Sequence, residues 1–404
     1  MGVVSDLGQD RLNQIMTRFG DGLAMGPDLV RAAEEAVRQA TRALDGRADL
    51  LCVFVNGTDP QEVERAARHA MAFSDARTVL GCSADGVIAA GKGIEEASAV
   101  SAWAAILPGA RLEPFRLETL QAEERLVVVG MPENSPEDVA GILLADPYSF
   151  PVDAFVERSE EVLPGLPLVG GLAGGGQGET RLFVDDQIVE TGAVGVVIGG
   201  PVNAVTLLSQ GARPIGPPMT VTSAEQNVLF ELAGAPALDK LEEIIAGLTE
   251  PERELATQGL LIGIAMDEYA EEHEQGDFLV RGVVGVDADT GALAVGDVVT
   301  TGQTVRFQVR DAGAADSNLT RLIRGFDIGP VEGALLFSCN GRGRAMFGAS
   351  DHDVRALDRF GSVGGFFADG EIGPVAGRNH IHGFTASILA FAGSDTGRTA
   401  PHER

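Results

Sequence analysis

One pattern recurs along this chain: an apolar strand, a helix, a second strand ending in a glycine turn, and another apolar strand. The clearest copies open with Val53-Phe54-Val55-Asn56-Gly57 and Phe337-Ser338-Cys339-Asn340-Gly341. Each is followed, after a helix-length interval, by Ala-Asp-Gly at 84–86 and 368–370. Asn56 and Asn340 lie 284 residues apart (340 − 56), as do Asp85 and Asp369 (369 − 85). Because the register is kept across a helix, an internal repeat constrains the fold more than any other feature.

A third copy lies between these two. We take Val127–Gly130 as its first strand, and the run 168–175 aligns with 79–86 at its glycines. An apolar strand is expected after each glycine turn, at 99–107, 193–198 and 381–391. Tight turns or close backbone approach explain the turn glycines, and a concave backbone nest for a ligand is the compatible alternative. These glycines are Gly81, Gly86, Gly170, Gly171 and Gly370.

Strands that alternate with helices predict an α/β fold, with mixed β-sheets flanked by helices. Helix starts are expected where proline or capping residues precede apolar periodicity; they are Pro27, Asp59-Pro60, Ser135-Pro136 and Ser350-Asp351. Short β-rich runs predict further strands, at 50–55, 125–129, 259–264, 278–286, 304–309 and 334–339.

The charge and cysteine content exclude several classes of protein. The 404 residues include 30 Lys plus Arg and 59 Asp plus Glu, a formal net charge of −29. Such a surface repels phosphate backbones and anionic lipids, so we predict no nucleic-acid or membrane partner. The three cysteines are odd in number and lack CxxC spacing, which indicates a reducing compartment. Without a signal peptide or a membrane-span-length apolar run, the predicted location is the cytoplasm.

A connector rich in proline and glycine, at 212–218, divides the chain into halves of similar length. We therefore predict an N-terminal module over 1–215 and a C-terminal module over 216–393. Residues 394–404 have no apolar group able to dock and are predicted to be a disordered tail.

Polar residues distinguish the last copy from the first. Thr58-Asp59-Pro60 follows the first Asn-Gly, whereas Arg342-Gly343-Arg344 follows the second, and Glu371 stands where the first copy has Val87. Arg378-Asn379-His380-Ile381-His382 comes before the final strand. Loop ends on a rigid α/β scaffold are common sites of ligand binding. We therefore predict a small-ligand site in this C-terminal unit.

The chemistry of these residues suits a zwitterion or a small acid. Arg342 or Arg344 offers a planar fork to a carboxylate, Glu371 accepts an amine, and Asn340 donates and accepts. Arg281 is a further candidate, or alternatively a salt-bridged residue of its strand. His380 and His382 share one face of a strand but lack a clear third ligand, so we predict no metal and no cofactor. Asn379, His380 and His382 are counted with the predicted ligand-binding residues.

Enzyme signatures are weak in this sequence. Cys82 and Cys339 lie beside turns, where small cysteines are usually packing residues. No G-x-S-x-G motif, dinucleotide fingerprint or phosphate loop with its lysine occurs. An enzyme acting on a small polar substrate at the same cleft remains the alternative to a binding module.

The motifs resemble the FIST family (F-box and intracellular signal transduction), with N-type and C-type modules in tandem. Val79–Gly86 is similar to a signature of the N-type module, and Ser209–Gly216 is similar to its close. The C-type motifs are Asn227–Leu232, Phe278–Arg281, Phe337–Gly343 and Gly364-Gly365-Phe366. The resemblance makes 227–232 a strand and adds Gly365 to the ligand-binding candidates. Ala212 stands where the family usually has a cysteine.

What the resemblance implies is a cytoplasmic sensory module for signal transduction that binds small ligands such as amino acids or their derivatives. No output domain is expected within the chain, so the protein would be a stand-alone sensor or act through a signalling protein partner. A homodimer with twofold symmetry is the default expectation for its assembly.

Overall fold

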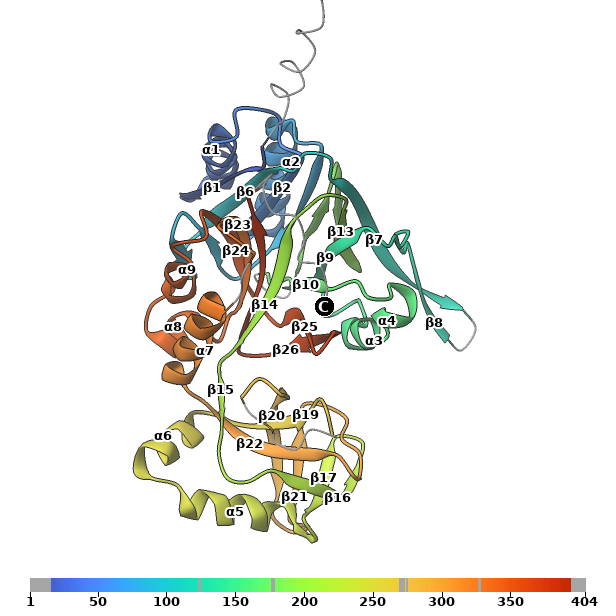
Figure 1. Ribbon diagram of the computed structural model, residues 1–404, viewed down its shortest axis with the longest axis vertical. Coiled ribbons are helices and arrows are strands. Elements are labelled where there is room, and N and C mark those ends of the chain that lie inside the picture. Colours follow the sequence, from blue (N-terminus) through green and yellow to red (C-terminus); the bar gives the residue numbers. More distant parts are fainter. Residues whose placement is uncertain are drawn as a thin grey trace, which may run out of the picture.

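The computed structural model describes residues 16–122, 125–175, 179–268, 273, 275–325 and 328–393. These residues form an α/β structure of four sheets and flanking helices (Figure 1). The predicted tail at 394–404 lies outside the described residues. Three of the sheets are built alike, and the fourth stands at the opposite end of the molecule, as Figure 1 shows.

Each of the three similar sheets takes four main strands from one copy of the repeat. The elements of the first unit are β1 (Arg18–Met25), α1 (Leu29–Arg42), β2 (Leu50–Asn56), α2 (Pro60–Ser74), β3 (Thr78–Ser83), β4 (Val87–Ala89), β5 (Lys92–Ile94) and β6 (Ala99–Ile106). Those of the second are β7 (Arg111–Ala122), β8 (Arg125–Val129), β9 (Asp138–Ala145), α3 (Val152–Glu157), α4 (Ser159–Val162), β10 (Leu168–Leu172), β11 (Leu182–Val184), β12 (Gln187–Val189) and β13 (Ala193–Gly199).

The third unit contains a long insertion after its first strand. Its own elements are β14 (Ala204–Gln210), α7 (Ala312–Gly325), β23 (Val331–Cys339), α8 (Gly343–Phe347), α9 (His352–Ala356), β24 (Ser362–Ala368), β25 (Glu371–Val375), β26 (Arg378–His382) and β27 (Thr385–Ala392). The inserted elements are β15 (Ala212–Pro214), β16 (Met219–Glu225), β17 (Val228–Leu232), β18 (Ala235–Pro236), α5 (Ala237–Gly247), α6 (Glu250–Gln258), β19 (Leu260–Ala265), β20 (Phe278–Asp287), β21 (Ala292–Val295) and β22 (Thr304–Arg310).

The three units exchange hairpins in a closed cycle. The sheet orders are β1-β6-β2-β3-β11-β12, β26-β25-β10-β9-β13-β7-β8 and β14-β27-β23-β24-β4-β5. The hairpin of each unit therefore completes the sheet of another unit. Equivalent backbone hydrogen bonds close the ring, from Ser83 N to Arg181 O (2.8 Å), Leu172 N to Gly370 O (2.8 Å) and Phe367 N to Gly86 O (2.9 Å). The predicted repeat is confirmed, and it builds one ring with approximate threefold symmetry.

The conserved register of the repeat explains three of its glycines. In each unit the strand before the turn runs parallel to one neighbour: β3 to β2, β10 to β9 and β24 to β23. A Cβ on Gly81, Gly170 or Gly365 would lie 1.8–2.0 Å from a carbonyl oxygen of that neighbour. The absent side chain thus allows a backbone approach that no other residue permits.

Aromatic side chains from the first and third units pack together in the centre of the ring. Phe54 of β2 lies 4.9 Å from Phe366 of β24 between ring centroids, and Trp103 of β6 lies 5.4 Å from Phe391 of β27. All four side chains are buried. Rings at these separations contribute beyond their area of burial, so the first and third units share one core.

Three predicted elements were wrong. Ser135-Pro136 starts no helix, because it forms a turn in which Asp138 N donates to Ser135 O (3.0 Å) before β9 begins. The strand of the second unit that corresponds to β2 and β23 is therefore β9, whereas the predicted 127–130 falls on the end of β8, an edge strand that pairs with β7. The predicted strand 381–391 is two strands, divided at Phe384, whose φ of 60° no strand accommodates.

The fourth sheet closes on itself as a barrel. Its order is β15-β22-β16-β17-β21-β20-β19, and β19 also pairs with β22. It has its own apolar core, which includes Ile262, Phe307 and Leu293. The predicted connector at 212–218 joins β14 of the third unit to this barrel, and Asp311 joins the last barrel strand, β22, to α7. The strand expected at 227–232 is confirmed as β17.

The structure describes no helix long and apolar enough to cross a lipid bilayer. All three cysteines, Cys52, Cys82 and Cys339, are free and buried.

Candidate functional site

Arg342 is fully buried and already has a carboxylate partner. It stands at the start of α8, and its Nε and Nη2 donate to Asp353 of α9 at 2.7 and 2.8 Å. Asp353 also accepts from Ser338 Oγ (2.7 Å) and contacts His352 Nδ1 (3.1 Å). Although burial opposes it, the Arg342 guanidinium holds the pKa of Asp353 well below its usual range. The Arg342 guanidinium, predicted to bind a ligand carboxylate, thus binds the Asp353 carboxylate of the chain itself.

Glu371 lies next to this pair and is also fully buried. Its Oε2 accepts from the backbone N (3.0 Å) and Oγ1 (2.7 Å) of Thr385, whereas Oε1 has no partner among the described residues. Burial raises the pKa of Glu371 to about 8, against the lowering effect of the Thr385 bonds. With a pKa of about 8 this carboxyl is largely protonated at neutral pH, and the Cys339 thiol is a side chain that interacts with it besides Thr385.

Cys339 is the other reactive side chain near Glu371. Burial, and then the Glu371 carboxyl, raise the pKa of the Cys339 thiol far above its ordinary value. A thiol that stays protonated is a poor nucleophile.

Further buried polar atoms without a partner lie close by. We call the junction where β14 and β27 meet β15 and β22 the seam. Four of the five such side-chain atoms in the described residues belong to residues at or next to the seam, Ser209 Oγ, Gln308 Oε1, Arg310 Nε and Glu371 Oε1.

Phe384 connects the two sides of the seam. The Arg310 guanidinium carbon lies 4.6 Å from the Phe384 ring centroid, and the Phe384 carbonyl accepts from Arg342 Nη1 at 3.3 Å. Buried polar groups are almost always hydrogen-bonded, to protein or to ordered water, so these unsatisfied atoms make the seam a candidate site for water or a polar ligand.

Asn340 lies on a different side, where the glycine turns meet. Its Nδ2 donates to Oδ1 of Asp369, and its side chain is exposed. Partial burial, and then the neighbouring Asp85 carboxylate, raise the pKa of Asp369 to about 6. The second unit has Gly174 at the equivalent position, and a Cβ there would lie 2.7 Å from Asp85 Oδ2.

Arg281 and the two histidines form another group, between the barrel and β26. Arg281 pairs with Asp297 (2.8 Å) and donates to the Ile381 carbonyl (3.0 Å), so it holds the barrel against β26. His382 Nε2 donates to the Gly373 carbonyl at 3.0 Å, and burial lowers the pKa of His382 to about 3. Burial and then Arg281 also lower the pKa of His380. Both imidazoles are therefore neutral at physiological pH.

The remaining predicted residues are separated from these groups. Asn379 accepts from Leu168 N and donates to Ser159 Oγ and Leu166 O, all within 3.0 Å, and so fastens β26 to the second unit. Arg344 is exposed and pairs with Glu96 of the first unit. Gly365 lies within β24 at the close strand contact described above.

The sequence predicted that Arg342 and Glu371 belong to one site, but it did not predict Thr385, Gln308 or Arg310. Gln308 and Arg310 belong to the barrel, and only the three-dimensional structure places them at the seam. No group of three or more His, Cys, Asp or Glu able to hold a metal ion occurs in the part of the chain that the structure describes.

Two family models match consecutive parts of this repeated α/β fold. The FIST N domain model matches residues 49–235 and the FIST C domain model matches 237–374. The chain belongs to the FIST family, whose domains are associated with sensing in signal transduction.

Two relatives from mycobacteria match nearly the whole chain. Uncharacterized protein Rv0628c of Mycobacterium tuberculosis (strain ATCC 25618 / H37Rv) is 43% identical over 385 residues, which cover 93% of this chain and 99% of the relative. Uncharacterized protein Mb0898c of Mycobacterium bovis is 40% identical over 385 residues, 93% of this chain and 98% of the relative.

Proposed function

We propose that this protein is a cytoplasmic sensor that binds an amino acid or another small carboxylic acid at the seam. The observation that carries the proposal is Glu371, a fully buried acid whose Oε1 has no partner among the described residues. A buried donor left unsatisfied costs about 1–3 kcal/mol, so a ligand that supplies its acceptor gains that much.

The chemistry at the seam suits a carboxylate bound beside a polar group. The protonated Glu371 donates one hydrogen bond to a carboxylate oxygen, and the Arg310 guanidinium supplies positive charge from the barrel side. Gln308 Oε1 is an acceptor for an amine or a hydroxyl. Arg342 keeps Asp353 as its partner and contributes the positive field behind Glu371.

The position of the seam accounts for a signal. Two chain crossings join the barrel to the third unit, at Gly211 and Asp311, and a backbone hydrogen bond of 3.2 Å links them. A ligand held by Glu371 on one side and Arg310 on the other draws the two bodies together, as in hinge closure. Such a change presents a different surface to a signalling protein, which we propose as the receiver of the signal.

The test is a calorimetric binding screen of the intact protein with free amino acids and small carboxylates. We expect at least one of them to bind, and Glu371→Ala to weaken it about tenfold or more, because alanine has neither the O–H nor the oxygen that Thr385 contacts. Glu231→Ala is the matched control, since Glu231 is an exposed barrel residue.

Two outcomes decide against the seam. One is that none of the screened acids binds, and the other is that both variants bind as wild type does. Consumption of a bound compound would instead identify an enzyme, although the protonated Cys339 does not favour a thiolate mechanism.

A further inference from the structure

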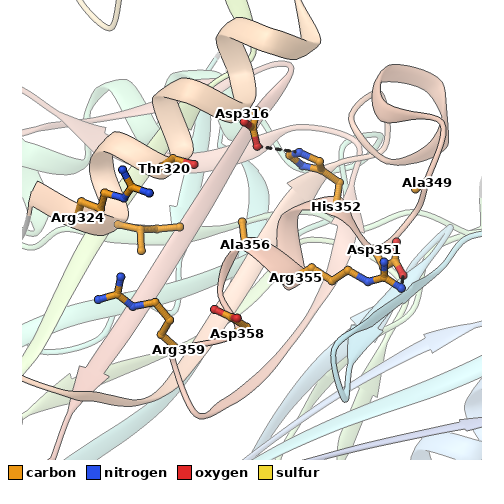
Figure 2. Close-up of a pocket in the computed structure, with 11 residues that line it drawn as sticks. Asp316, Thr320, Arg324, Ala349, Asp351, His352, Arg355, Ala356, Asp358 and Arg359 are labelled. Atoms are coloured by element: carbon orange, nitrogen blue, oxygen red, sulfur yellow. Dashed lines mark hydrogen bonds and ion pairs between the residues drawn. The ribbon is translucent and has the colours of Figure 1, made fainter.

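A pocket that the proposed function does not use opens on the outer face of the third unit. It has a volume of about 480 Å³ and lies between α7 and the segment around α9. This volume is within the range of small-molecule sites. The side chains of Arg324, Arg355 and Arg359 line it (Figure 2).

Two of these arginines have no protein partner that the structure describes. Neither Arg324 nor Arg359 forms a hydrogen bond or an ion pair with a described residue. By contrast, Arg38, Arg213 and Arg281 each pair with a carboxylate elsewhere in the molecule. In a chain of net charge −29, a pair of uncompensated guanidinium groups in one pocket is unusual.

The carboxylates around the pocket leave this positive end uncompensated. Asp316 contacts His352 Nε2 at 3.1 Å, and Asp351 pairs with Arg355 at 2.5 Å. Figure 2 shows Arg324 and Arg359 at one end of the pocket, whereas Arg355 lies beside Asp351 at the other. Asp358 also lines the pocket, and the Arg359 guanidinium extends away from it in Figure 2.

Like charges at the same end of a pocket repel one another, and a bound anion removes the repulsion. Arginine is suited to this role because its planar fork matches the oxygen geometry of phosphate. Two unpaired guanidinium groups match the charge of a phosphate monoester, which is close to −2 at neutral pH. The Thr320 hydroxyl and the apolar Ile323 and Ala356 complete this wall of the pocket.

We propose that this pocket binds the phosphate group of a small phosphomonoester, with Arg324 and Arg359 as its two anchors. The site lies on the outer face of α7 and α9, and neither Arg324 nor Arg359 is among the residues proposed to bind the acid at the seam.

The test is titration calorimetry of the intact protein with glucose 6-phosphate at fixed ionic strength, with succinate as a dianion that lacks phosphate. Glucose 6-phosphate binds, and succinate binds at least tenfold more weakly. Arg324→Gln and Arg359→Gln each weaken the phosphate ester about tenfold or more, as expected for loss of a charge-assisted hydrogen bond. Arg324→Lys keeps the charge but loses the fork, so it has an intermediate effect.

Arg42→Gln is the matched control, because Arg42 is an exposed arginine of α1 with no ion pair among the described residues. The control binds within twofold of wild type, and so does Glu371→Ala, which tests the seam. The proposal is overturned if glucose 6-phosphate does not bind, if succinate binds equally well, or if Arg42→Gln weakens binding as much as the pocket variants. Melting temperatures of the unliganded variants check that each is folded.

Discussion

The buried ion pair of Arg342 and Asp353 gives the sharpest prediction about stability. The two side chains are 0% and 6% exposed, and two hydrogen bonds of 2.7 and 2.8 Å join them. Arg342→Ala removes both bonds and leaves the Asp353 carboxylate buried, with only Ser338 and His352 as side-chain partners. Breaking a buried pair in this way costs about 3–5 kcal/mol of unfolding free energy.

Arg344→Ala is the control for this prediction. Arg344 stands two residues further on, but its ion pair with Glu96 is exposed, with side-chain exposures of 54% and 73%. An exposed pair contributes about 0–1 kcal/mol. The unfolding free energies of both variants are measured in urea, followed by fluorescence and by circular dichroism. If the two signals change together, unfolding is two-state and one free energy describes each variant.

The same pair predicts a pH dependence. The pKa of Asp353 is lowered in the folded state, so its contribution is present above the unfolded pKa of about 4 and is lost as the pH falls toward the folded pKa. The reasoning is refuted if Arg342→Ala costs no more than Arg344→Ala. It is also refuted if a double replacement of Arg342 and Asp353 by apolar residues is less stable than Arg342→Ala, because that replacement removes the stranded charge.

Three further predictions concern Glu371, Gly365 and Asn379. The pKa of Glu371 is raised to about 8 in the folded state, so its contribution to the unfolding free energy is present below the unfolded pKa near 4.3 and is lost as the pH rises to about 8. Glu371→Gln should therefore flatten the fall in melting temperature between these pH values. A profile unchanged by the substitution contradicts the raised pKa. Gly365→Ala places a Cβ 1.8 Å from Leu336 O and should lower the unfolding free energy, measured in urea, by about 1–3 kcal/mol or more. Gly247→Ala is the control, because nothing lies within 4 Å of its Cβ, and it should be neutral or slightly stabilising. Equal changes in the two variants would show that the close contact between β24 and β23 does not require glycine. Asn379→Ala removes three hydrogen bonds, to Leu168, Ser159 and Leu166, and should lower the unfolding free energy by about 2–3 kcal/mol. Amide hydrogen exchange in β26 should become faster. Unchanged exchange there would show that Asn379 does not hold β26 against the second unit.

The sequence predicted the units of the fold well, because the repeat is written in local patterns. The common spacing of Asn56 to Asp85 and of Asn340 to Asp369 located matching strands and turns in two units. The second unit was harder, since Ser135-Pro136 has the composition of a helix start but forms a turn before β9. The break at Phe384 was also missed, because it requires a positive φ at a residue other than glycine.

The arrangement of the units was beyond local patterns. Each hairpin pairs with the sheet of another unit, and such pairing leaves no periodic signal in either segment. The barrel inserted between β14 and α7 likewise brings Gln308 and Arg310 to a seam with Thr385, far away in the sequence. The division into modules over 1–215 and 216–393 stays a prediction.

The candidate site shows the same limit. The polar character of the C-terminal unit was visible from the sequence, and Arg342 and Glu371 do lie together. Whether a charge is free was not visible, because the partner of Arg342 is Asp353, which the sequence presents as the first turn of a helix. The pocket arginines Arg324 and Arg359 lie on separate segments and carried no motif.

Amide hydrogen exchange with a ligand identified by the binding screen tests the central claim most directly. We predict slower exchange in the segments that form the seam, 209–212, 308–311 and 384–386, and no change in the segment 352–359 around α9. Slower exchange confined to other segments, or none on addition of a saturating ligand, would contradict the placement of the sensory site at Glu371.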